Sequence, residues 1–167
     1  MEVTETQITF ETKNHDLDNN DNFSMDDRWL VYDTRCESGI GANSSIEKVN
    51  VKTGETVVLY EVPNQTEYGP GVGAASFSPT ENKVVFIHGL MNCNSERPYC
   101  HWRRTAVAVD ESRPRQPIFM DARDVTVPFT PGALRGGTHR HEWSADGQWI
   151  GFFGNMMTGV TYGSSLA

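Results

Sequence analysis

One pattern occurs three times in this chain, and it constrains the fold more than any other feature. It consists of an aromatic residue, a serine, a short polar turn and an apolar strand, and its copies span residues 23–32, 77–86 and 143–152 without a gap in their alignment. The serine of the second copy lies 54 residues after that of the first, and the serine of the third copy lies 66 residues after that of the second. A motif that recurs at this period indicates a repeat architecture, in which each unit buries its apolar faces only against a neighbour.

Each copy is typical of a β-hairpin. The turns of the second and third copies contain Pro and Asp-Gly, which supply the backbone angles of tight turns. The strands that follow are rich in β-branched and aromatic residues. A second hairpin is predicted after the first two copies, over residues 45–60 and 105–121. Two hairpins per repeat predict a four-stranded antiparallel sheet of roughly 50 to 60 residues, the size of a propeller blade. We therefore expect an all-β fold with no substantial helix, and a β-sandwich with three unrelated hairpins is the alternative.

The length of the chain limits how much of a propeller it contains. The 167 residues hold about two and a half blades, whereas propellers close with about four to eight. We predict a single partial propeller, with blade one over residues 16–63, blade two over 70–122 and the first hairpin of blade three over 137–153. Residues 154–167 are predicted to form a poorly structured tail, resembling a truncated or frame-shifted end. The exposed edge strand and blade face of such an array predict self-association or marginal stability.

Two further expectations concern particular segments. Phe23, Phe77 and Trp143 begin the three copies, and they are expected to occupy equivalent buried positions between sheets. Residues 7–10 are predicted to form a lone strand without an upstream partner, and a frayed terminus is the alternative.

Composition excludes some classes of partner. A net charge of −8 and a pI near 5.0 argue against a nucleic-acid partner, because phosphate binding needs a basic surface. No stretch approaches the ~18 apolar residues of a membrane span. Residues 1–10 lack the apolar core of a signal peptide, so we expect the chain as it stands in the cytoplasm, or in the periplasm if a leader was removed. Cys93 and Cys100 flank one loop and either form a disulfide in an oxidising compartment or stay reduced.

The repeat resembles that of a known class of propellers. The form Ser-x-Asp-Gly-x-x-Ile-x-Phe over residues 144–152 is similar to the repeat of TolB-like β-propellers. A closer resemblance is to an uncharacterised bacterial propeller family of unknown function, over residues 7–10, 28–33, 46–50, 85–89 and 134–139. A distant likeness to oligogalacturonate lyase, a propeller enzyme with histidine-bound manganese, rests on residues 86–89 and 141–144. These resemblances imply a propeller that binds a ligand or protein, or a metal-dependent lyase.

Four of the five histidines are predicted to lie on one face of the propeller. His88 and His101 belong to the loop between the second and third strands of blade two, and His139 and His141 belong to the entry into blade three. Both loops open on the same face of a propeller. Because His139 and His141 are two residues apart, a regular strand points them the same way, with Glu142 on the opposite side. Neutral imidazoles suit transition metals, so this pair is predicted to bind manganese. The alternative is that His88 and His141 are core histidines.

Two arginines complete the candidate site. Arg135 and Arg140 flank His139 and have the geometry to bind a carboxylate in bidentate fashion. Together with His88 and His101, they are the predicted ligand-binding residues. The sequence favours a binding module for a protein or a small carbohydrate-like ligand. The alternative is a lyase acting on uronate-containing oligosaccharides, in which a cation acidifies the proton next to the carboxylate and a histidine or arginine completes the elimination.

Overall fold

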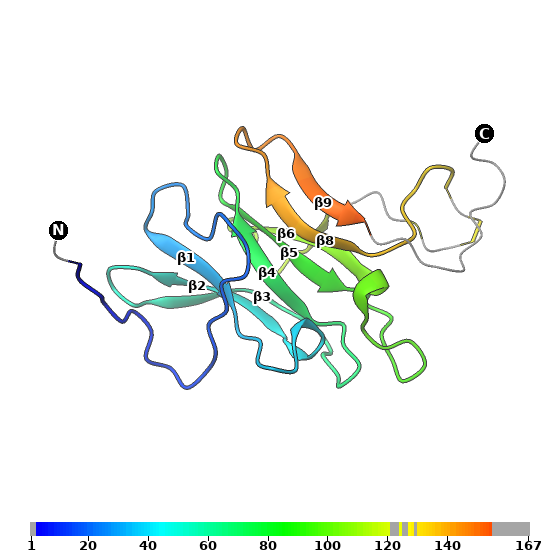
Figure 1. Ribbon diagram of the computed structural model, residues 1–167, viewed down its shortest axis with the longest axis horizontal. Helices are drawn as coiled ribbons and strands as arrows, with labels where there is room; N and C mark the ends of the chain where they lie inside the picture. Colours follow the sequence, from blue (N-terminus) through cyan, green and yellow to red (C-terminus); the bar gives the residue numbers. More distant parts are fainter. Residues whose placement is uncertain (1–2, 121–123, 125–126, 129, 155–167) are drawn as a thin grey trace.

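The structure is a computed structural model that describes residues 3–120, 124, 127–128 and 130–154 (Figure 1). In these residues it is all-β, and its two helical segments are single 3-10 turns, η1 (Ile40–Ala42) and η2 (His101–Arg103). The predicted fold class is confirmed. The strands are β1 (Trp29–Asp33), β2 (Ser45–Asn50), β3 (Thr56–Glu61), β4 (Val72–Phe77), β5 (Lys83–Gly89), β6 (Arg104–Asp110), β7 (Ile118–Phe119), β8 (Thr138–Trp143) and β9 (Ile150–Gly154).

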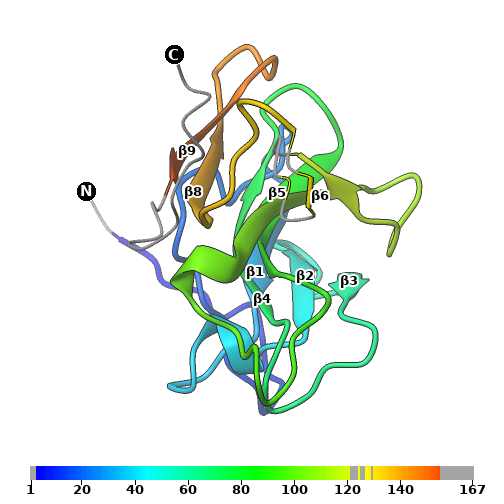
Figure 2. The ribbon, with the colours of Figure 1, turned by 90° about the vertical axis from the view of Figure 1, so that its right-hand side faces the viewer.

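The strands form three antiparallel sheets in chain order, which Figures 1 and 2 show packed one after another. The first sheet has the order β1-β2-β3, the second β4-β5-β6-β7 and the third β8-β9. Strand β4 contacts β1, and β8 contacts β5 and β6. Consecutive sheets stacked face to face are consistent with a partial propeller-like fold. No helix in the described part of the chain is long and apolar enough to cross a membrane.

The three copies of the sequence pattern form equivalent hairpins. In each copy the first residue lies opposite the eighth, in the pairs Phe23–Leu30, Phe77–Val84 and Trp143–Ile150. In the first and third copies the serine hydroxyl also fixes the turn in the same way. Ser24 and Ser144 each accept a hydrogen bond from a tryptophan backbone N–H at 3.0 Å and donate one to an aspartate two residues further on. The repeat therefore specifies hydrogen bonds as well as hydrophobic residues.

The core lies between the sheets. Phe77, Val84 and Phe86 of the second sheet share one buried cluster with Val31 and Ile46 of the first. A smaller cluster lies between the second and third sheets, where Trp143 and Ile150 pack against Val85, Ala106 and Ala108. Small and β-branched residues on one sheet thus receive the large side chains of the next.

The structure corrects the prediction that the first residues of the three copies are equally buried. Phe23 is 51% exposed, whereas Phe77 is buried and Trp143 is half-buried. Phe77 and Trp143 pack against a preceding sheet, and no described sheet precedes Phe23. Residues 16–23 also form no regular strand and meet β1 only at two isolated bridges. Side-chain amides attach this segment to the second sheet, because Asn19 and Asn22 donate to the carbonyls of Ala74 and Ala75 in β4 at 2.7 and 3.1 Å.

Residues 7–10 form no strand in the structure. The chain that follows them runs along the first sheet, where the Glu11 carboxylate accepts a hydrogen bond from Thr56 and Lys13 forms an ion pair with Glu47. The prediction of a lone strand is wrong, because side chains rather than a backbone ladder attach this segment. The poorly structured tail was predicted over residues 154–167. Gly154 is the last residue of β9, and residues 155–167 lie outside the described residues.

Strands β4 and β8 each contain a β-bulge at the same position of the repeat. Ala74 and Arg140 lie 66 residues apart, and both adopt a left-handed backbone conformation, with φ of 57° and 54°. The pairing between β8 and β9 shifts by one residue across the bulge, so that His139 lies opposite Phe153 and Glu142 opposite Gly151. Such a shift reverses the side-chain alternation beyond the bulge.

Candidate functional site

Three loops meet at one end of the first two sheets (Figure 1). We call the surface formed by residues 34–44, 62–71 and 90–103 the loop face. The backbone N–H of Tyr99 donates to the Tyr68 carbonyl at 2.8 Å, and the Gln65 amide donates to the Gly41 carbonyl at 2.8 Å. The loops therefore support one another. The entry to the third sheet joins them, because a Cβ on Gly137 would lie 1.9 Å from the carbonyl oxygen of His101.

An open groove of about 260 Å³ lies on the loop face. Two tyrosines, Tyr68 and Tyr99, contribute aromatic surface, and Glu67 and Ser38 contribute polar groups. Gly41 brings the backbone against the Tyr99 ring, since a Cβ there would lie 2.6 Å from Cδ1 of that ring. The volume is below the roughly 300–1,000 Å³ of sites for drug-sized ligands, so the groove suits a small one.

Tyr99 connects this groove to a buried arginine. Its hydroxyl accepts a hydrogen bond from Nε of Arg104 at 2.6 Å. Arg104 is buried at the start of β6 and also donates from Nη1 to Nδ1 of His139 at 2.9 Å. Burial raises the pKa of Tyr99, while the Arg104 charge and hydrogen bond act in the opposite direction. Three loop-face and strand residues therefore form a single hydrogen-bonded chain from the groove to the third sheet.

Arg104 determines which tautomer His139 adopts. A guanidinium has no acceptor, so Nδ1 of His139 must accept the hydrogen bond and the neutral ring carries its proton on Nε2. Burial lowers the pKa of His139, and the charges of Arg104 and His101 lower it further. The neutral ring in this arrangement offers a donor at Nε2, with the lone pair of Nδ1 already engaged. Metal binding by His139 would require this hydrogen bond to break or the Nε2 proton to leave.

The prediction that His139 and His141 point the same way is wrong. Across the bulge at Arg140, His139 shares its side of the sheet with Glu142. His141 shares the opposite side with Trp143 and is completely buried, with its ring centroid 6.1 Å from that of Phe152. A left-handed arginine within a strand leaves no pattern in the sequence, and the sequence therefore predicts regular alternation here.

His88 occupies the core of the second sheet. Its Nε2 lies 3.0 Å from the Tyr60 hydroxyl, and its Nδ1 is hydrogen-bonded to the Gly89 carbonyl. Burial lowers its pKa and favours the neutral ring. These contacts match the core histidine that was the alternative to a ligand-binding role. His101, by contrast, is exposed on η2 at the loop face.

The two predicted arginines do not lie in the groove. Arg135 is half-buried in the segment before β8. Arg140 is exposed, 4.0 Å from the Glu142 carboxylate, and lines a separate pocket with Phe152 and Phe153. Within the described ranges, no group of three or more His, Cys, Asp or Glu side chains is placed to hold a metal ion. Cys36, Cys93 and Cys100 are free thiols.

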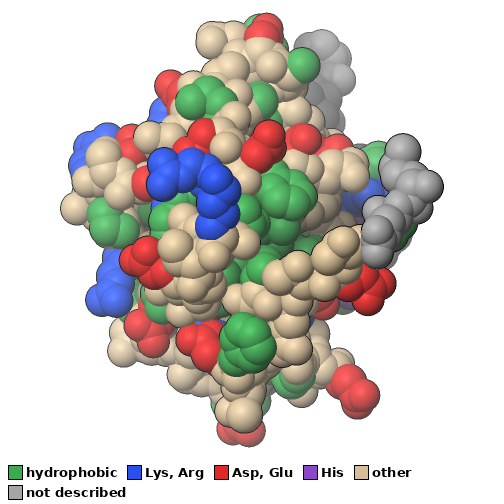
Figure 3. All heavy atoms as spheres, turned by 90° about the vertical axis from the view of Figure 1, so that its left-hand side faces the viewer, with side chains coloured by type: hydrophobic (Ala, Val, Ile, Leu, Met, Phe, Trp, Pro, Cys, Tyr) green, Lys and Arg blue, Asp and Glu red, His purple; other side chains and the backbone are tan. Residues whose placement is uncertain are grey.

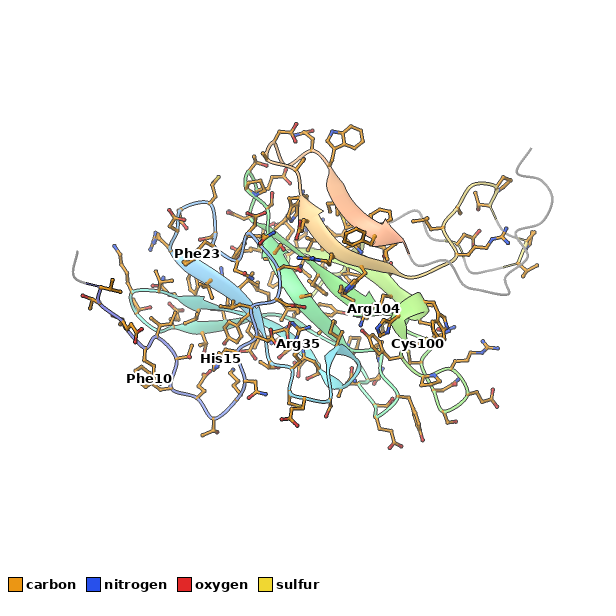
Figure 4. The ribbon with its side chains drawn as sticks, in the orientation of Figure 1. Phe10, His15, Phe23, Arg35, Cys100 and Arg104 are labelled. Atoms are coloured by element: carbon orange, nitrogen blue, oxygen red, sulfur yellow. The ribbon has the colours of Figure 1, made fainter. Side chains whose placement is uncertain are left out.

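A second polar cluster beside the groove was missed by sequence reasoning. Asp33 is fully buried at the end of β1, where its Oδ2 accepts a hydrogen bond from the backbone N–H of Ala74 at 2.7 Å. Its Oδ1 accepts a hydrogen bond from the backbone N–H of Arg35 and lies 3.3 Å from Nε of the Arg35 guanidinium. The same guanidinium forms ion pairs with Asp16 and Asp18, each at 3.0 Å. Burial raises the pKa of Asp33 to about 6, although Ala74 and Arg35 oppose the shift. Figure 4 shows Arg35 and Arg104 at neighbouring sheets.

Comparison with known proteins places the chain in a family. A family described as "Protein of unknown function (DUF3748)" matches residues 71–158, more than half of the chain. The chain is also 38% identical over 146 residues to "Uncharacterized protein YidR" of Escherichia coli (strain K12). That match covers 87% of this chain and 34% of the relative, so the chain spans about one third of the relative's length. No solved structure matches significantly. The resemblance to an uncharacterised bacterial family is confirmed: the chain belongs to the DUF3748 family.

Proposed function

We propose that this chain forms part of a TolB-like propeller that acts as a binding module, and that its loop face holds a small carbohydrate-like ligand. The observation that carries the proposal is the position of Tyr99. Its ring lines the groove while its hydroxyl is held by buried Arg104 at 2.6 Å. An aromatic side chain fixed in this way keeps its orientation before a ligand arrives, which lowers the entropy cost of binding.

The lining of the groove suits a sugar ring. Tyr68 and Tyr99 offer apolar aromatic surface to the carbon–hydrogen faces of a pyranose, and the Glu67 carboxylate accepts hydrogen bonds from hydroxyl groups. Small-ligand sites commonly combine apolar walls with a few polar groups that fix orientation. Because Glu67 is the charged residue of the lining, the groove favours a neutral sugar over a uronate.

Replacing Tyr68 by alanine is expected to weaken binding of a neutral disaccharide by at least tenfold. Tyr68 is 37% exposed, so its removal changes the groove with little effect on folding. Cellobiose is a suitable probe, titrated against the purified protein and followed by NMR chemical shifts of the loop-face residues. Digalacturonate, titrated in parallel, is expected to bind more weakly.

Two further variants separate binding from folding. Phe119→Ala removes an exposed aromatic ring from β7, away from the groove, and is expected to leave the affinity unchanged. Tyr99→Phe keeps the ring but removes the hydrogen bond from Arg104, and is expected to weaken binding by a smaller factor than Tyr68→Ala. Failure of both sugars to shift loop-face signals in the wild-type protein would refute the carbohydrate-like ligand.

The alternative function, a manganese-dependent lyase, remains a prediction made from the sequence. It requires His139 to lose either its hydrogen bond from Arg104 or its Nε2 proton, and His141 to rotate away from the second sheet. Manganese is paramagnetic, so binding at this pair would broaden the NMR signals of both rings selectively. We expect the His139→Ala, His141→Ala double variant to bind manganese as the wild type does. A loss of affinity in the double variant would favour the lyase.

A further inference from the structure

All three cysteines of the chain lie on the loop face. Cys36 is exposed in the loop after β1. Cys93 and Cys100 are half-buried in the loop between β5 and β6, where six residues separate them. The loop face therefore carries one exposed thiol and two partly enclosed thiols that share a loop.

The loop between β5 and β6 folds back on itself between the two half-buried cysteines. Asn94 and Arg97 form an isolated antiparallel bridge, in which each backbone N–H donates to the carbonyl of the other residue, at 3.2 and 3.1 Å. The Asn94 side chain reinforces the turn, because its Oδ1 accepts hydrogen bonds from the backbone N–H groups of Glu96 and Arg97. The turn reverses the chain directly after Cys93 and brings it back toward that residue.

Contacts at Gly69 show how closely the chain returns. A Cβ on Gly69 would lie 3.2 Å from Sγ of Cys93 and 3.1 Å from Cβ of Tyr99, so both atoms pack against the same point of the backbone. Tyr99 directly precedes Cys100, which is labelled in Figure 4. Burial raises the pKa of Cys100, the Arg103 charge lowers it, and the negative charge of Cys93 raises it. The two thiols are therefore within electrostatic range of each other.

We propose that Cys93 and Cys100 are a redox pair, which an anionic low-molecular-weight disulfide such as oxidised glutathione converts into an intrachain disulfide bond. Residues 94–98 are exposed, so this segment can adjust to the Cβ separation of about 3.5 to 4.5 Å that the bond requires. The pair is independent of the ligand proposed for the groove.

Two successive thiol–disulfide exchanges account for every atom and electron. A thiolate of the pair attacks one sulfur of oxidised glutathione, which forms a mixed disulfide and releases one glutathione thiolate. The second thiolate of the pair then attacks the protein sulfur of the mixed disulfide and releases the other glutathione thiolate. Two protein thiols are thereby oxidised, one glutathione disulfide is reduced to two glutathione molecules, and the two thiol protons pass to these molecules.

The local charge around the pair suits an anionic oxidant. The chain as a whole carries a net charge of −8, and Figure 3 shows acidic side chains spread over the side of the molecule that lies at the left of Figure 1. Residues 93–104, by contrast, contain three arginines and one glutamate. Positive charge near a cysteine also favours the thiolate, which is the reactive form. The loop that holds the pair is thus a basic segment of an acidic protein.

The disulfide bond encloses one wall of the groove. Pro98 and Tyr99 line the groove and lie between the two cysteines. Closing a loop restricts the unfolded chain, so oxidation is expected to raise the midpoint of thermal unfolding, and a reductant is expected to reverse the rise. The pair therefore couples the redox state of the surroundings to the rigidity of the groove wall.

Peptide mapping after incubation with oxidised glutathione tests the proposal. The native protein is incubated, its remaining thiols are alkylated, and a protease that cleaves after glutamate is added. Cleavage after the exposed Glu96 separates Cys93 from Cys100, and cleavage after Glu37 leaves Cys36 in a third peptide. The peptides of Cys93 and Cys100 are expected to stay joined until a reductant is added. In reduced glutathione all three thiols are expected to be alkylated.

Two serine variants complete the test. Cys36→Ser is the matched control, and it is expected to give the same joined peptides and the same rise in thermal midpoint as the wild type. Cys93→Ser is expected to give no joined peptides and one thermal midpoint in both buffers, with its fold checked by far-UV circular dichroism. Wild-type peptides that separate without a reductant, or a joined peptide that contains Cys36, would overturn the proposal.

Discussion

Replacing Phe86 by alanine is expected to lower the free energy of unfolding by about 3 to 5 kcal/mol. Phe86 is completely buried in the cluster between the first and second sheets, with its ring centroid 5.2 Å from that of Tyr60. Truncation removes apolar surface from the core and leaves a cavity that the two sheets cannot fully close. Urea denaturation followed by tryptophan fluorescence measures the loss.

Phe119→Ala is the matched control for this prediction. Phe119 is more than half exposed on the short outer strand β7, so the same truncation should change the free energy of unfolding by less than about 0.5 kcal/mol. Equal losses in the two variants would show that Phe86 does not lie between packed sheets.

The stability of the wild-type protein is expected to fall relative to that of the Asp33→Asn variant as the pH rises from 4 to 7. Burial raises the pKa of Asp33 to about 6 in the folded protein, against 3.8 as its ordinary value. The folded state therefore holds this proton more tightly than the unfolded state does. The resulting stabilisation is complete below pH 4 and is lost as the pH rises through about 6. The expected relative loss is about 2 kcal/mol.

Asp146→Asn supplies a control without a pH trend in this range. A hydrogen bond from Ser144 lowers the pKa of the exposed Asp146 below its ordinary value of 3.8, so its contribution is present throughout pH 4 to 7 and this variant should follow the wild type in parallel. Urea denaturation at pH 4, 5, 6 and 7 compares the three proteins. If the Asp33→Asn variant follows the wild type in parallel over this range, Asp33 does not titrate as the structure implies.

The hairpins could be predicted from the sequence because their determinants are local. A serine two residues before an aspartate fixes the turn, and the aromatic residue beside it lies opposite the eighth residue of the copy. In the third copy, the Ser144 hydroxyl donates a hydrogen bond to Asp146 at 2.6 Å within the predicted turn. Trp143 lies opposite Ile150 across the hairpin. The second hairpins were predicted for the same reason, from β-branched runs on either side of a turn.

The bulge at Arg140 could not be predicted. A left-handed conformation is unusual for arginine, and here β8 is bulged against β9. The equivalent residue in the second sheet is Ala74, which no sequence rule marks as left-handed either. The consequence for the site is large, because one extra residue moves His141 into the core and leaves His139 at the Arg104 contact.

The residues that support the groove were missed because their contacts are long-range. Arg104 begins β6, where an arginine is usually solvated, yet it is buried beside Tyr99 and His139. Asp33 likewise reaches the backbone of Ala74, 41 residues further along the chain. Only the stacking of one sheet on another brings these groups together. Phe23 illustrates the same limit, since its burial depends on a neighbouring sheet rather than on its own hairpin.

Nuclear Overhauser effects from the indole of Trp143 test most directly whether consecutive repeats stack as sheets. The structure predicts contacts between this indole and the methyl groups of Val85, Ala106 and Ala108, all of which belong to the preceding sheet. These methyl groups are assignable in a protein of 167 residues. Observation of contacts from the indole to this cluster of methyl groups is the predicted result. A Trp143 indole with contacts only to its own hairpin would contradict the stacked-sheet architecture.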